Sequence, residues 1–440
     1  MARRRRWKRG ISSTAMAALL ILVLFLALCA LNVPIAVALG AVALGAMVVD
    51  LGAAGLMNAA IVMFEGARKF PLIAIPLFVL AGGIMNATSI SRRLIAFCNA
   101  LIGFVRGGLS MVSIAASMFF AEISGSAVAD VAALGSVLIP EMKKRGYPKE
   151  LAASVMSSAA SLAIIIPPSI PMILYAVIAD TSVVKLFVAG IVPGVLGGAL
   201  LMAVAYWHAW RLGLPSEAAF HLANVWRTFR EAGLALLLPV IILGGIFGGV
   251  VTATEGAALA VVAALAIGLV YRELDLSVLY TALVDGVTQT AVVMLLVATS
   301  ALLGVYLTET QLPQRLAASL IELTQNRYLI LALLNVAFFV LGFFLHGAAA
   351  IILVVPIVMP LAVAVGIDPI HFGVIVTLNL AVGQQTPPVA SVLMVACSIA
   401  KANMWETSRT NVGFVGVLLL VLILVTYVPA VSLALVDLFY

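Results

Sequence analysis

Apolar residues along this 440-residue chain run in long continuous stretches rather than alternating with polar residues. About a dozen such stretches occur, and many hold the roughly 20 residues that a helix needs to cross about 30 Å of hydrocarbon. The clearest are Ala15–Val49, Leu186–Tyr206, Leu234–Val251, Ala253–Val270 and Val412–Leu435. A membrane β-barrel would show short alternating segments instead. The pattern predicts an all-α polytopic membrane protein with about 11–12 transmembrane helices.

The pattern repeats with an offset of half the chain. Ile165–Ser169 and Gln385–Val389 each contain a proline pair, and 387 − 167 = 220. The loop at 141–150 carries four Lys or Arg residues, whereas its counterpart Leu361–His371 carries none. Under the positive-inside rule these loops face opposite sides of the membrane. We therefore predict two inverted-topology repeats, an architecture typical of transporters.

Four segments follow from this division. We expect a basic N-terminal tail at 1–14, a first inverted repeat at 15–210, a connector at 211–232 and a second inverted repeat at 233–440. The first repeat would hold scaffold helices, a hairpin and a broken helix. The connector mixes Glu217, His221 and Arg227 with apolar Phe220 and Phe229, which predicts an amphipathic segment lying on the membrane surface.

A re-entrant hairpin is predicted around Ser124-Gly125-Ser126. Between Met111 and Pro140, only Glu122 and Asp130 are ionisable, and they flank these small residues. Placing a charged group at membrane depth costs free energy, so residues of this kind are expected to have a structural or functional role. Small residues between two apolar arms, each too short to span alone, are typical of a hairpin tip whose backbone lines a cavity. A packed contact between helices, with Asp130 paired to a neighbour, remains an alternative.

The proline pairs predict two broken helices. Proline removes a backbone donor and clashes with the preceding turn, so carbonyls before each pair are freed. Carbonyl, hydroxyl and amide oxygens are ligands that suit Na⁺ in unwound transporter segments. The half-helix that follows each break directs its N-terminal amides at the same region, where a carboxylate can bind. A simple proline kink is the alternative. The candidate Na⁺ ligands are Ser161, Ile166, Pro167, Asn379, Gln385, Thr386 and Pro387.

The charge balance supports a membrane rather than a nucleic-acid partner. Lys and Arg exceed Asp and Glu by 24 − 18 = 6, and six cations cluster between Arg3 and Arg9. The remaining chain is neutral, and no basic face exists beyond the tail. Mean hydropathy is +1.24, as expected for a chain embedded in a lipid bilayer. The tail favours a cytoplasmic N-terminus, and the long apolar run behind it predicts a retained helix rather than a signal peptide.

Several motifs resemble one transporter family. The run Ser110–Asp130, followed by Ile139-Pro140 and Arg145–Pro148, is similar to the large membrane subunit of TRAP transporters, the tripartite ATP-independent periplasmic class. Ile165–Pro171, Gly366–Gly373 and Thr386–Pro388 carry the same resemblance. It implies a Na⁺-driven, elevator-type carrier of the bacterial inner membrane. It also implies two partners, a small four-helix membrane subunit and a soluble periplasmic substrate-binding protein.

The resemblance implies import of an organic anion such as a C4-dicarboxylate, a sialic acid or another carboxylate. It places a second hairpin tip at His346–Ala348, although an acidic residue is expected close to that tip and none is present. The basic tail is also longer than is usual in the family. The candidate substrate-binding residues are Ser124, Gly125, Ser126, Asp130, Pro168, Ser169, His346 and Gly347.

Other functional classes fit the sequence less well. A channel would need a continuous polar or charged lining, and the sequence has no charge rings. An enzyme would need an acid/base, nucleophile or metal constellation, and no such spacing is recognisable. No nucleotide-binding GxxxxGK[ST] motif occurs, so ion gradients must supply the work, and no organic cofactor is expected. A stand-alone Na⁺/carboxylate symporter of related elevator architecture, needing no binding protein, remains the alternative.

Overall fold

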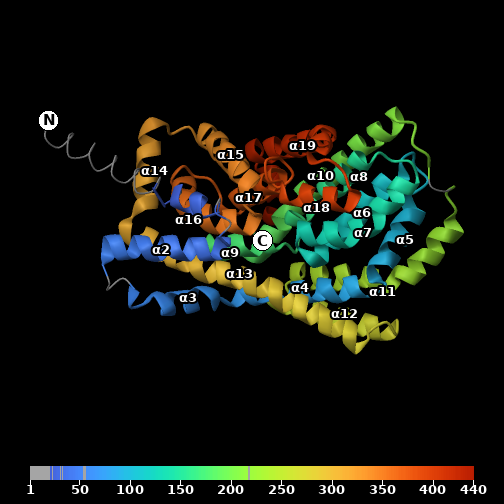
Figure 1. The fold of residues 1–440 in the computed structure, drawn as a ribbon, viewed down its shortest axis with the longest axis horizontal. Helices are drawn as coiled ribbons and strands as arrows, with labels where there is room; N and C mark the ends of the chain where they lie inside the picture. The colour runs from blue at the N-terminus through green and yellow to red at the C-terminus, as the bar shows by residue number, and fades with distance from the viewer. Residues whose placement is uncertain (1–19, 22, 30, 32, 53–55, 217–218) are drawn as a thin grey trace.

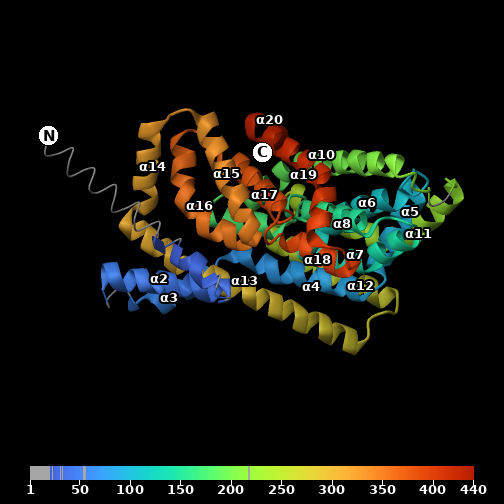
Figure 2. The same cartoon turned by 45° about the horizontal axis from the view of Figure 1, so that its top comes forward.

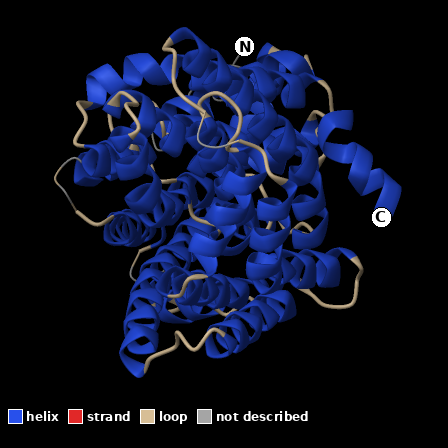
Figure 3. Ribbon diagram, turned by 90° about the vertical axis from the view of Figure 1, so that its right-hand side faces the viewer, coloured by secondary structure: helices blue, strands red, loops and turns tan. Residues whose placement is uncertain are grey.

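The computed structural model describes residues 20–440 except 22, 30, 32, 53–55 and 217–218. Over these residues the chain is helical without a strand, which confirms the all-α class (Figure 3). Within the described residues, eight helices are long and apolar enough to cross a membrane, and five shorter apolar helices accompany them. The predicted basic tail, residues 1–14, lies outside the described residues.

Helix boundaries follow local sequence signals. α12 spans Ala253–Val270, the same residues as one predicted apolar stretch. It begins with a capping box, in which Thr252 Oγ1 accepts a hydrogen bond from Glu255 N at 3.3 Å and the Glu255 carboxylate accepts one from Thr252 N at 2.8 Å. Two other predicted stretches are interrupted by proline, at Pro34 before α2 and at Pro429 before α20.

One layer of the molecule, which we call the scaffold layer, lies along the lower edge of Figure 1. Its longest helix, α13 (Leu276–Thr310), packs along α2, α3 and α4. α12 packs against both α4 and α11. The other members are α2 (Ile35–Leu51), α3 (Ala59–Ala67), the 3₁₀ turn η2 (Phe70–Ile73), α4 (Ala74–Ala87) and α11 (Leu222–Phe247).

The other layer, which we call the hairpin layer, lies above the scaffold layer in Figures 1 and 2. Its first half comprises α6 (Gly108–Ser124), α7 (Ala127–Lys144), α8 (Lys149–Ser161), η3 (Leu162–Ile164), α9 (Ile170–Ile178) and α10 (Val183–Arg211). Its second half comprises α15 (Arg327–Phe344), α16 (Gly347–Ala364), α17 (Pro369–Gly383), α18 (Ser391–Ala400), α19 (Met404–Tyr427) and α20 (Ala430–Phe439). Two short helices, α5 (Ile90–Ile102) and α14 (Leu312–Leu323), connect the layers.

The elements repeat with the offset that the prolines predict. α16 is α7 shifted by 220 residues at both ends, since 347 − 127 = 220 and 364 − 144 = 220. α14 and α15 correspond to α5 and α6, and α17, α18 and α19 to α8, α9 and α10, with starts 219–222 residues apart and ends 216–222 residues apart. Both proline pairs lie in the non-helical segments between the two members of each broken helix.

The two halves have opposite orientations. Lys143 Nζ, at the end of α7, donates a hydrogen bond to Ala400 O, at the end of α18, at 2.9 Å. α7 and α18 therefore end at the same face. α8 starts at this face, directly after α7, and the broken helix α8–α9 leads away from it. Its counterpart α17–α18 leads toward it, as inverted repeats require. The four cations of loop 141–150 predict that this face is cytoplasmic.

The connector does not form a separate helix. α10 ends at Arg211, and the polar residues from Leu222 onward form the first turns of α11, which continues to Phe247. The predicted boundary at 232/233 thus falls inside a helix. The segment before α11 packs on the α5–α6 loop, where Phe220 meets Phe104 at a ring-centroid distance of 5.2 Å. Its position on the membrane surface stays a prediction.

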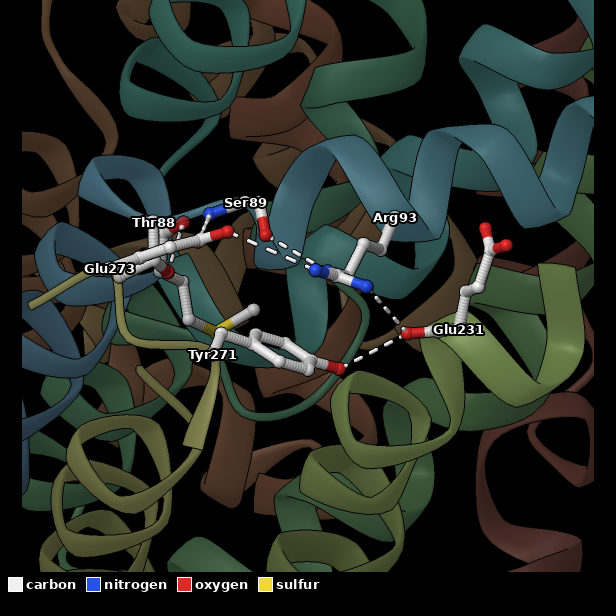
Figure 4. A network of polar contacts seen from close by, with 7 residues as sticks. Thr88, Ser89, Arg93, Glu231, Tyr271 and Glu273 are labelled. Carbon is white, nitrogen blue, oxygen red and sulfur yellow. Dashed lines mark hydrogen bonds and ion pairs between the residues drawn. The ribbon is translucent and has the colours of Figure 1, made fainter. Parts of the chain in front are cut away.

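Arg93 ties α5 to the scaffold layer (Figure 4). Its guanidinium lies 4.0 Å from the centroid of the Tyr271 ring and 3.9 Å from the Glu273 carboxylate. It also donates hydrogen bonds to Ser89 Oγ at 2.9 Å and to Glu231 O at 3.4 Å. Glu273 in turn accepts a hydrogen bond from Ser89 N at 2.6 Å. We call these five residues the Arg93 clamp; it joins α5, α11 and the α12–α13 loop.

We predict that Arg93→Ala lowers the thermal midpoint of the purified protein, by the equivalent of about 1–2 kcal/mol, because it removes a cation–π contact and hydrogen bonds to a charged group. Partial burial opposes ionisation of Glu273, yet bonding to Ser89 and the charges of Arg93 and Arg92 hold its pKa below the ordinary value. The contribution of the ionised Glu273 carboxylate to the free energy of unfolding is therefore complete above the ordinary carboxyl pKa. It is lost as the pH falls through the lowered pKa of Glu273 in the folded protein.

The difference between wild type and Arg93→Ala should accordingly shrink at acid pH. Differential scanning fluorimetry across a pH series measures this difference in thermal midpoint. Arg315→Ala, the counterpart on α14, provides the control, because the Arg315 side chain makes no hydrogen bond or ion pair with any residue that the structure describes, and only its backbone bonds to Gln311 and Ser319. Equal losses in the two variants would contradict a clamping role.

Candidate functional site

The first hairpin tip contacts the first proline break. α6 ends at Ser124, Gly125 adopts a left-handed conformation with φ of 56°, and Ser126 caps α7. Gly125 O accepts a hydrogen bond from Ile170 N, the first amide of α9, at 3.4 Å. A Cβ atom at Gly125 would lie 3.0 Å from Ile170 N and 3.2 Å from Pro168 O. Glycine is therefore required here by both backbone conformation and space.

The first break places hydroxyl and carbonyl oxygens in a fully buried environment. Ser161 and Ser169 are both 0% exposed. The Ser169 hydroxyl donates to Ile164 O at 2.8 Å, and the Ser161 hydroxyl donates to Ser157 O at 3.0 Å. Ile166 and Pro167 lie between these serines in the non-helical segment. The oxygens predicted as Na⁺ ligands in the first half are thus gathered around one break.

The second hairpin tip contacts the second break. α15 ends at Phe344 and α16 begins at Gly347, so the tip is at Leu345-His346, slightly earlier than the predicted His346–Ala348. A Cβ atom at Gly347 would lie 2.9 Å from the Gln384 side-chain nitrogen. On the other arm of the hairpin, α15, a Cβ at Gly342 would lie 3.0 Å from Gly383 Cα. The His346 side chain is exposed.

The second break carries the same kinds of oxygen as the first. Gln385 is fully buried, and Thr386 donates a hydrogen bond from Oγ1 to Val382 O at 3.1 Å. Asn379, fully buried on α17, donates from Nδ2 to Ile375 O at 3.1 Å and to Asn335 Oδ1 of α15. The Asn379 Oδ1 atom is buried and has no hydrogen-bond partner among the described residues. A carbonyl oxygen left in this state is available to a ligand.

A buried polar cluster joins the two halves, which we call the Ser158 cluster. Ser158 of α8 contacts Gln385 Oε1 of the second break at 2.6 Å and Asn411 Oδ1 of α19 at 2.9 Å. Asn411 Nδ2 donates to the same Gln385 oxygen at 3.5 Å. Because a hydroxyl has one hydrogen, Ser158 can satisfy only one of the two oxygens at a time. The cluster therefore presents excess oxygen acceptors beside the break.

Sequence reasoning missed Ser158 and Asn411 for different reasons. Ser158 lies in the small-residue run of α8, where Ser161 alone was selected as a candidate. Asn411 lies just before the apolar stretch predicted to begin at Val412, but α19 begins at Met404, so Asn411 is inside the helix and 1% exposed. The polar residues between 404 and 411 were the feature of the sequence that could have indicated an earlier helix start.

A cavity of about 490 Å³ lies between the first hairpin tip and the scaffold layer. The hairpin contributes Ser126 and Ala129, and the scaffold contributes residues from the end of α4 and the beginning of α13. Among the latter are Asn86, Asp285 and Gln289, which sequence reasoning did not single out. Because α4 ends and α13 begins at the face of the Arg93 clamp, the cavity lies toward the predicted cytoplasmic side.

Ionisable groups near the tips are few. Asp130 is fully buried in the first turn of α7, where the helix N-terminus favours a negative charge. Glu122 lies in the last turn of α6, and its Oε2 atom is buried without a described hydrogen-bond partner. The arrangement is thus rich in neutral oxygens, with two carboxyl groups beside the first tip. Oxygen ligands of this kind suit a hard cation.

Comparisons with known proteins agree on the family. The profile described as "Tripartite ATP-independent periplasmic transporter, DctM component" matches residues 22–431. The isethionate TRAP transporter permease protein DctMQ of Oleidesulfovibrio alaskensis is 40% identical over 402 residues, which are 91% of this chain and 63% of that protein. The C4-dicarboxylate TRAP transporter large permease protein DctM of Pseudomonas aeruginosa is 41% identical over 377 residues, 86% of this chain and 88% of that protein.

Further similarities cover the same region. The sialic acid TRAP transporter large permease protein SiaM of Vibrio cholerae is 37% identical over 386 residues, 88% of this chain and 90% of that protein. The crystal structure of the Alcanivorax borkumensis YdaH transporter has a TM-score of 0.64 at 15% identity, covers 88% of this chain and 90% of that chain, and so supports the fold alone. The chain therefore belongs to the DctM family of TRAP transporter large permeases, multi-pass proteins of the bacterial inner membrane.

Proposed function

We propose that this chain is a Na⁺-coupled secondary transporter that imports an organic anion, a carboxylate, delivered by a periplasmic substrate-binding protein. The observation that carries the proposal is the contact of each hairpin tip with a proline break, through Gly125 at Ile170 and Gly347 at Gln384. Paired broken helices and hairpins of opposite orientation create a site within the membrane where backbone and side-chain oxygens are available without charged rings.

Sodium coupling is supported by the chemistry of the two breaks. The hydroxyls of Ser161 and Thr386 and the amide oxygens of Asn379 and Gln385 are buried or half-buried. Together with the carbonyls of the broken segments they form oxygen-only sets, which suit Na⁺ better than a transition metal. The unpartnered Asn379 Oδ1 and the excess acceptors of the Ser158 cluster are the oxygens most open to a cation.

Carboxylate binding is supported by the helix ends beside the tips. α9 begins at Ile170 directly after the first break and α18 begins at Ser391 after the second, so the partial positive charge of each N-terminus is directed at the site. We place the anion between the Ser124–Ser126 tip with Asp130, Pro168 and Ser169 on one side and His346-Gly347 on the other. A sodium ion bound nearby would neutralise the repulsion between Asp130 and an anionic substrate.

Transport requires that the hairpin layer move against the scaffold layer in an elevator motion. One contact between the layers is Lys69, just before η2, which donates to Val177 O near the end of α9 at 3.2 Å. This contact lies at the face opposite the Arg93 clamp, because α4 begins there and α9 ends there. The cavity that Asp285 lines lies on the Arg93-clamp side of this contact, and we propose that it opens to the predicted cytoplasmic face, as in an inward-facing state.

The partners follow from the family. A DctM-type chain is one component of a tripartite system, and relatives are named large permease proteins. We propose that a small four-helix membrane subunit packs on the scaffold layer and that a periplasmic binding protein delivers the substrate. The alternative is a stand-alone Na⁺/carboxylate symporter, and the following experiment distinguishes them.

We predict that the chain reconstituted alone in proteoliposomes transports little, and that adding the small subunit and the loaded binding protein restores uptake. Uptake should require an inward Na⁺ gradient and accelerate with an inside-negative potential, since each net charge moved inward gains about 2.3 kcal/mol per 100 mV. The measurement is the accumulation of radiolabelled organic acids inside the proteoliposomes. Full uptake by the isolated chain would establish the stand-alone symporter, and equal uptake with Na⁺ replaced by K⁺ at constant pH would remove sodium coupling.

We further predict that Ser158→Ala raises the Na⁺ concentration for half-maximal uptake about tenfold, equivalent to about 1.4 kcal/mol, because it removes one oxygen from the Ser158 cluster. Ser154→Ala is the matched control. Ser154 lies one turn earlier on α8, and its hydroxyl donates to Thr407 O at 3.2 Å without touching the break. A Na⁺ dependence that changes equally in both variants would show that the cluster is structural only.

A further inference from the structure

A groove on the outer side of the hairpin layer reaches the second break, where Gln385, Thr386 and Pro387 are proposed Na⁺ ligands, but most of its α19 wall is not used by the proposed transport site. It has a volume of about 500 Å³ and lies between the second break, at Gln385–Pro387, and α19. α19 lies on the side of the molecule away from α3, α12 and α13 (Figures 1 and 2). The groove therefore faces away from the scaffold layer and toward the surrounding bilayer.

One stripe of the α19 wall of the groove has a charged end and an apolar end, and Ser408, Asn411 and Val415 of α19 line the groove beside it. Trp405, Arg409, Val412, Gly416 and Leu419 line it at spacings of four, three, four and three residues, which place them on one helix face. The polar end is near the start of α19 at Met404, and the apolar end is toward the membrane centre. A ligand that follows this wall must itself be amphiphilic.

Arg409 at the polar end has an unsatisfied charge. Its side chain is exposed and makes no hydrogen bond or ion pair with the residues that the structure describes. It lies five residues into α19, about 8 Å from the helix start at 1.5 Å per residue. A guanidinium at that depth in a membrane helix needs an anion or water, and it binds phosphate oxygens well because its donors form a planar fork.

The apolar end has room for a hydrocarbon chain. A Cβ atom at Gly416 would meet no atom within 4 Å, so the groove floor is open there. Val412 beside it is 67% exposed, and Leu419 continues the apolar wall. Trp405, at the other end, is 66% exposed, as expected for an aromatic side chain at the membrane interface.

We infer that this groove binds an anionic phospholipid of the cytoplasmic leaflet, with its phosphate on Arg409 and one acyl chain over Gly416. The leaflet follows from Lys143 and Ala400, because α18 ends, and α19 starts, at the face that carries the cationic loop. Anionic lipids in this leaflet are attracted to basic pockets between membrane helices. Such a lipid would lie against Gln385–Pro387, so its presence in the groove would affect the second break. That effect on transport rests on the proposed function, whereas binding of the lipid to the groove does not.

The test measures lipid retention directly. The purified chain, supplied with equal phosphatidylglycerol and phosphatidylcholine in mild detergent, is examined by native mass spectrometry. We expect wild type to retain phosphatidylglycerol preferentially, and Arg409→Gln to lose that preference by about fivefold, the factor for one cation near an anionic surface. Gly416→Leu should reduce retention of both lipids without lowering the thermal midpoint, because the added side chain enters open space.

Matched controls come from the same chain. Arg315→Gln removes an exposed cation of α14 that does not line the groove, and Gly304→Leu adds a side chain on α13 where a Cβ also meets nothing within 4 Å. Both controls should retain phosphatidylglycerol as wild type does. Retention that is unchanged in Arg409→Gln and Gly416→Leu, or equally reduced in the controls, overturns the inference.

Two further arms exclude other occupants. Inorganic phosphate or succinate, added in large excess, should leave the bound lipid in place; displacement by either would make the groove a site for a soluble anion and overturn the inference. A maleimide should label Val412→Cys equally in the isolated chain and in the complex with the small membrane subunit. Protection in the complex would show a protein interface there instead, and the lipid assignment would fail.

Discussion

The whole arrangement depends on covering backbone polar groups where helices break inside a membrane. Hydrocarbon offers no hydrogen bonds, so each break must be met by another segment of the chain. The hairpin tips supply that segment, and they approach closely only because the contacting residues lack side chains. Gly125 O accepts the first amide of α9, and Gly342 and Gly383 bring α15 and α17 nearly into backbone contact. A side chain at any of these positions would separate tip and break, leaving carbonyls and amides exposed to lipid.

Inverted repeats turn this local constraint into a connection between the halves. Because the second half runs in the opposite direction, α8 of the first repeat lies beside α18 and α19 of the second. Ser158 therefore reaches Gln385 and Asn411, which are more than 200 residues away in the chain. A ligand that orders the second break would therefore also affect the position of α8 through these hydrogen bonds. The second break is thus tied by hydrogen bonds to α8, the helix that leads into the first break.

The sequence was sufficient for the features that have a strong local cause. Proline pairs fix the breaks, small residues fix the first tip, and loop charges fix the relative orientation of the repeats. Contacts between helices were not predictable, because apolar stretches do not specify which faces meet. Asn411 was overlooked because the apolar stretch beginning at Val412 set the apparent helix start, whereas the helix begins at Met404. Asp285 was overlooked because a single carboxylate near a helix end has no spacing signal, and only packing against the first hairpin places it in a cavity.

The repeats share a fold but are not fixed with equal strength. Arg93 and Arg315 occupy nearly equivalent positions on α5 and α14, yet only the Arg93 side chain contacts partners in the described structure. Its partners Tyr271 and Glu273 lie in the α12–α13 loop, and 273 − 220 = 53 falls in the run Leu51-Gly52-Ala53-Ala54-Gly55, which has no charged or aromatic residue. The residues that correspond to Tyr271 and Glu273, Leu51 and Ala53, therefore offer Arg315 no aromatic ring and no carboxylate. Among the described residues the Arg93 side chain clamps α5, whereas the Arg315 side chain makes no such contact at α14, so we expect the α14 connection to be the easier of the two to reorient.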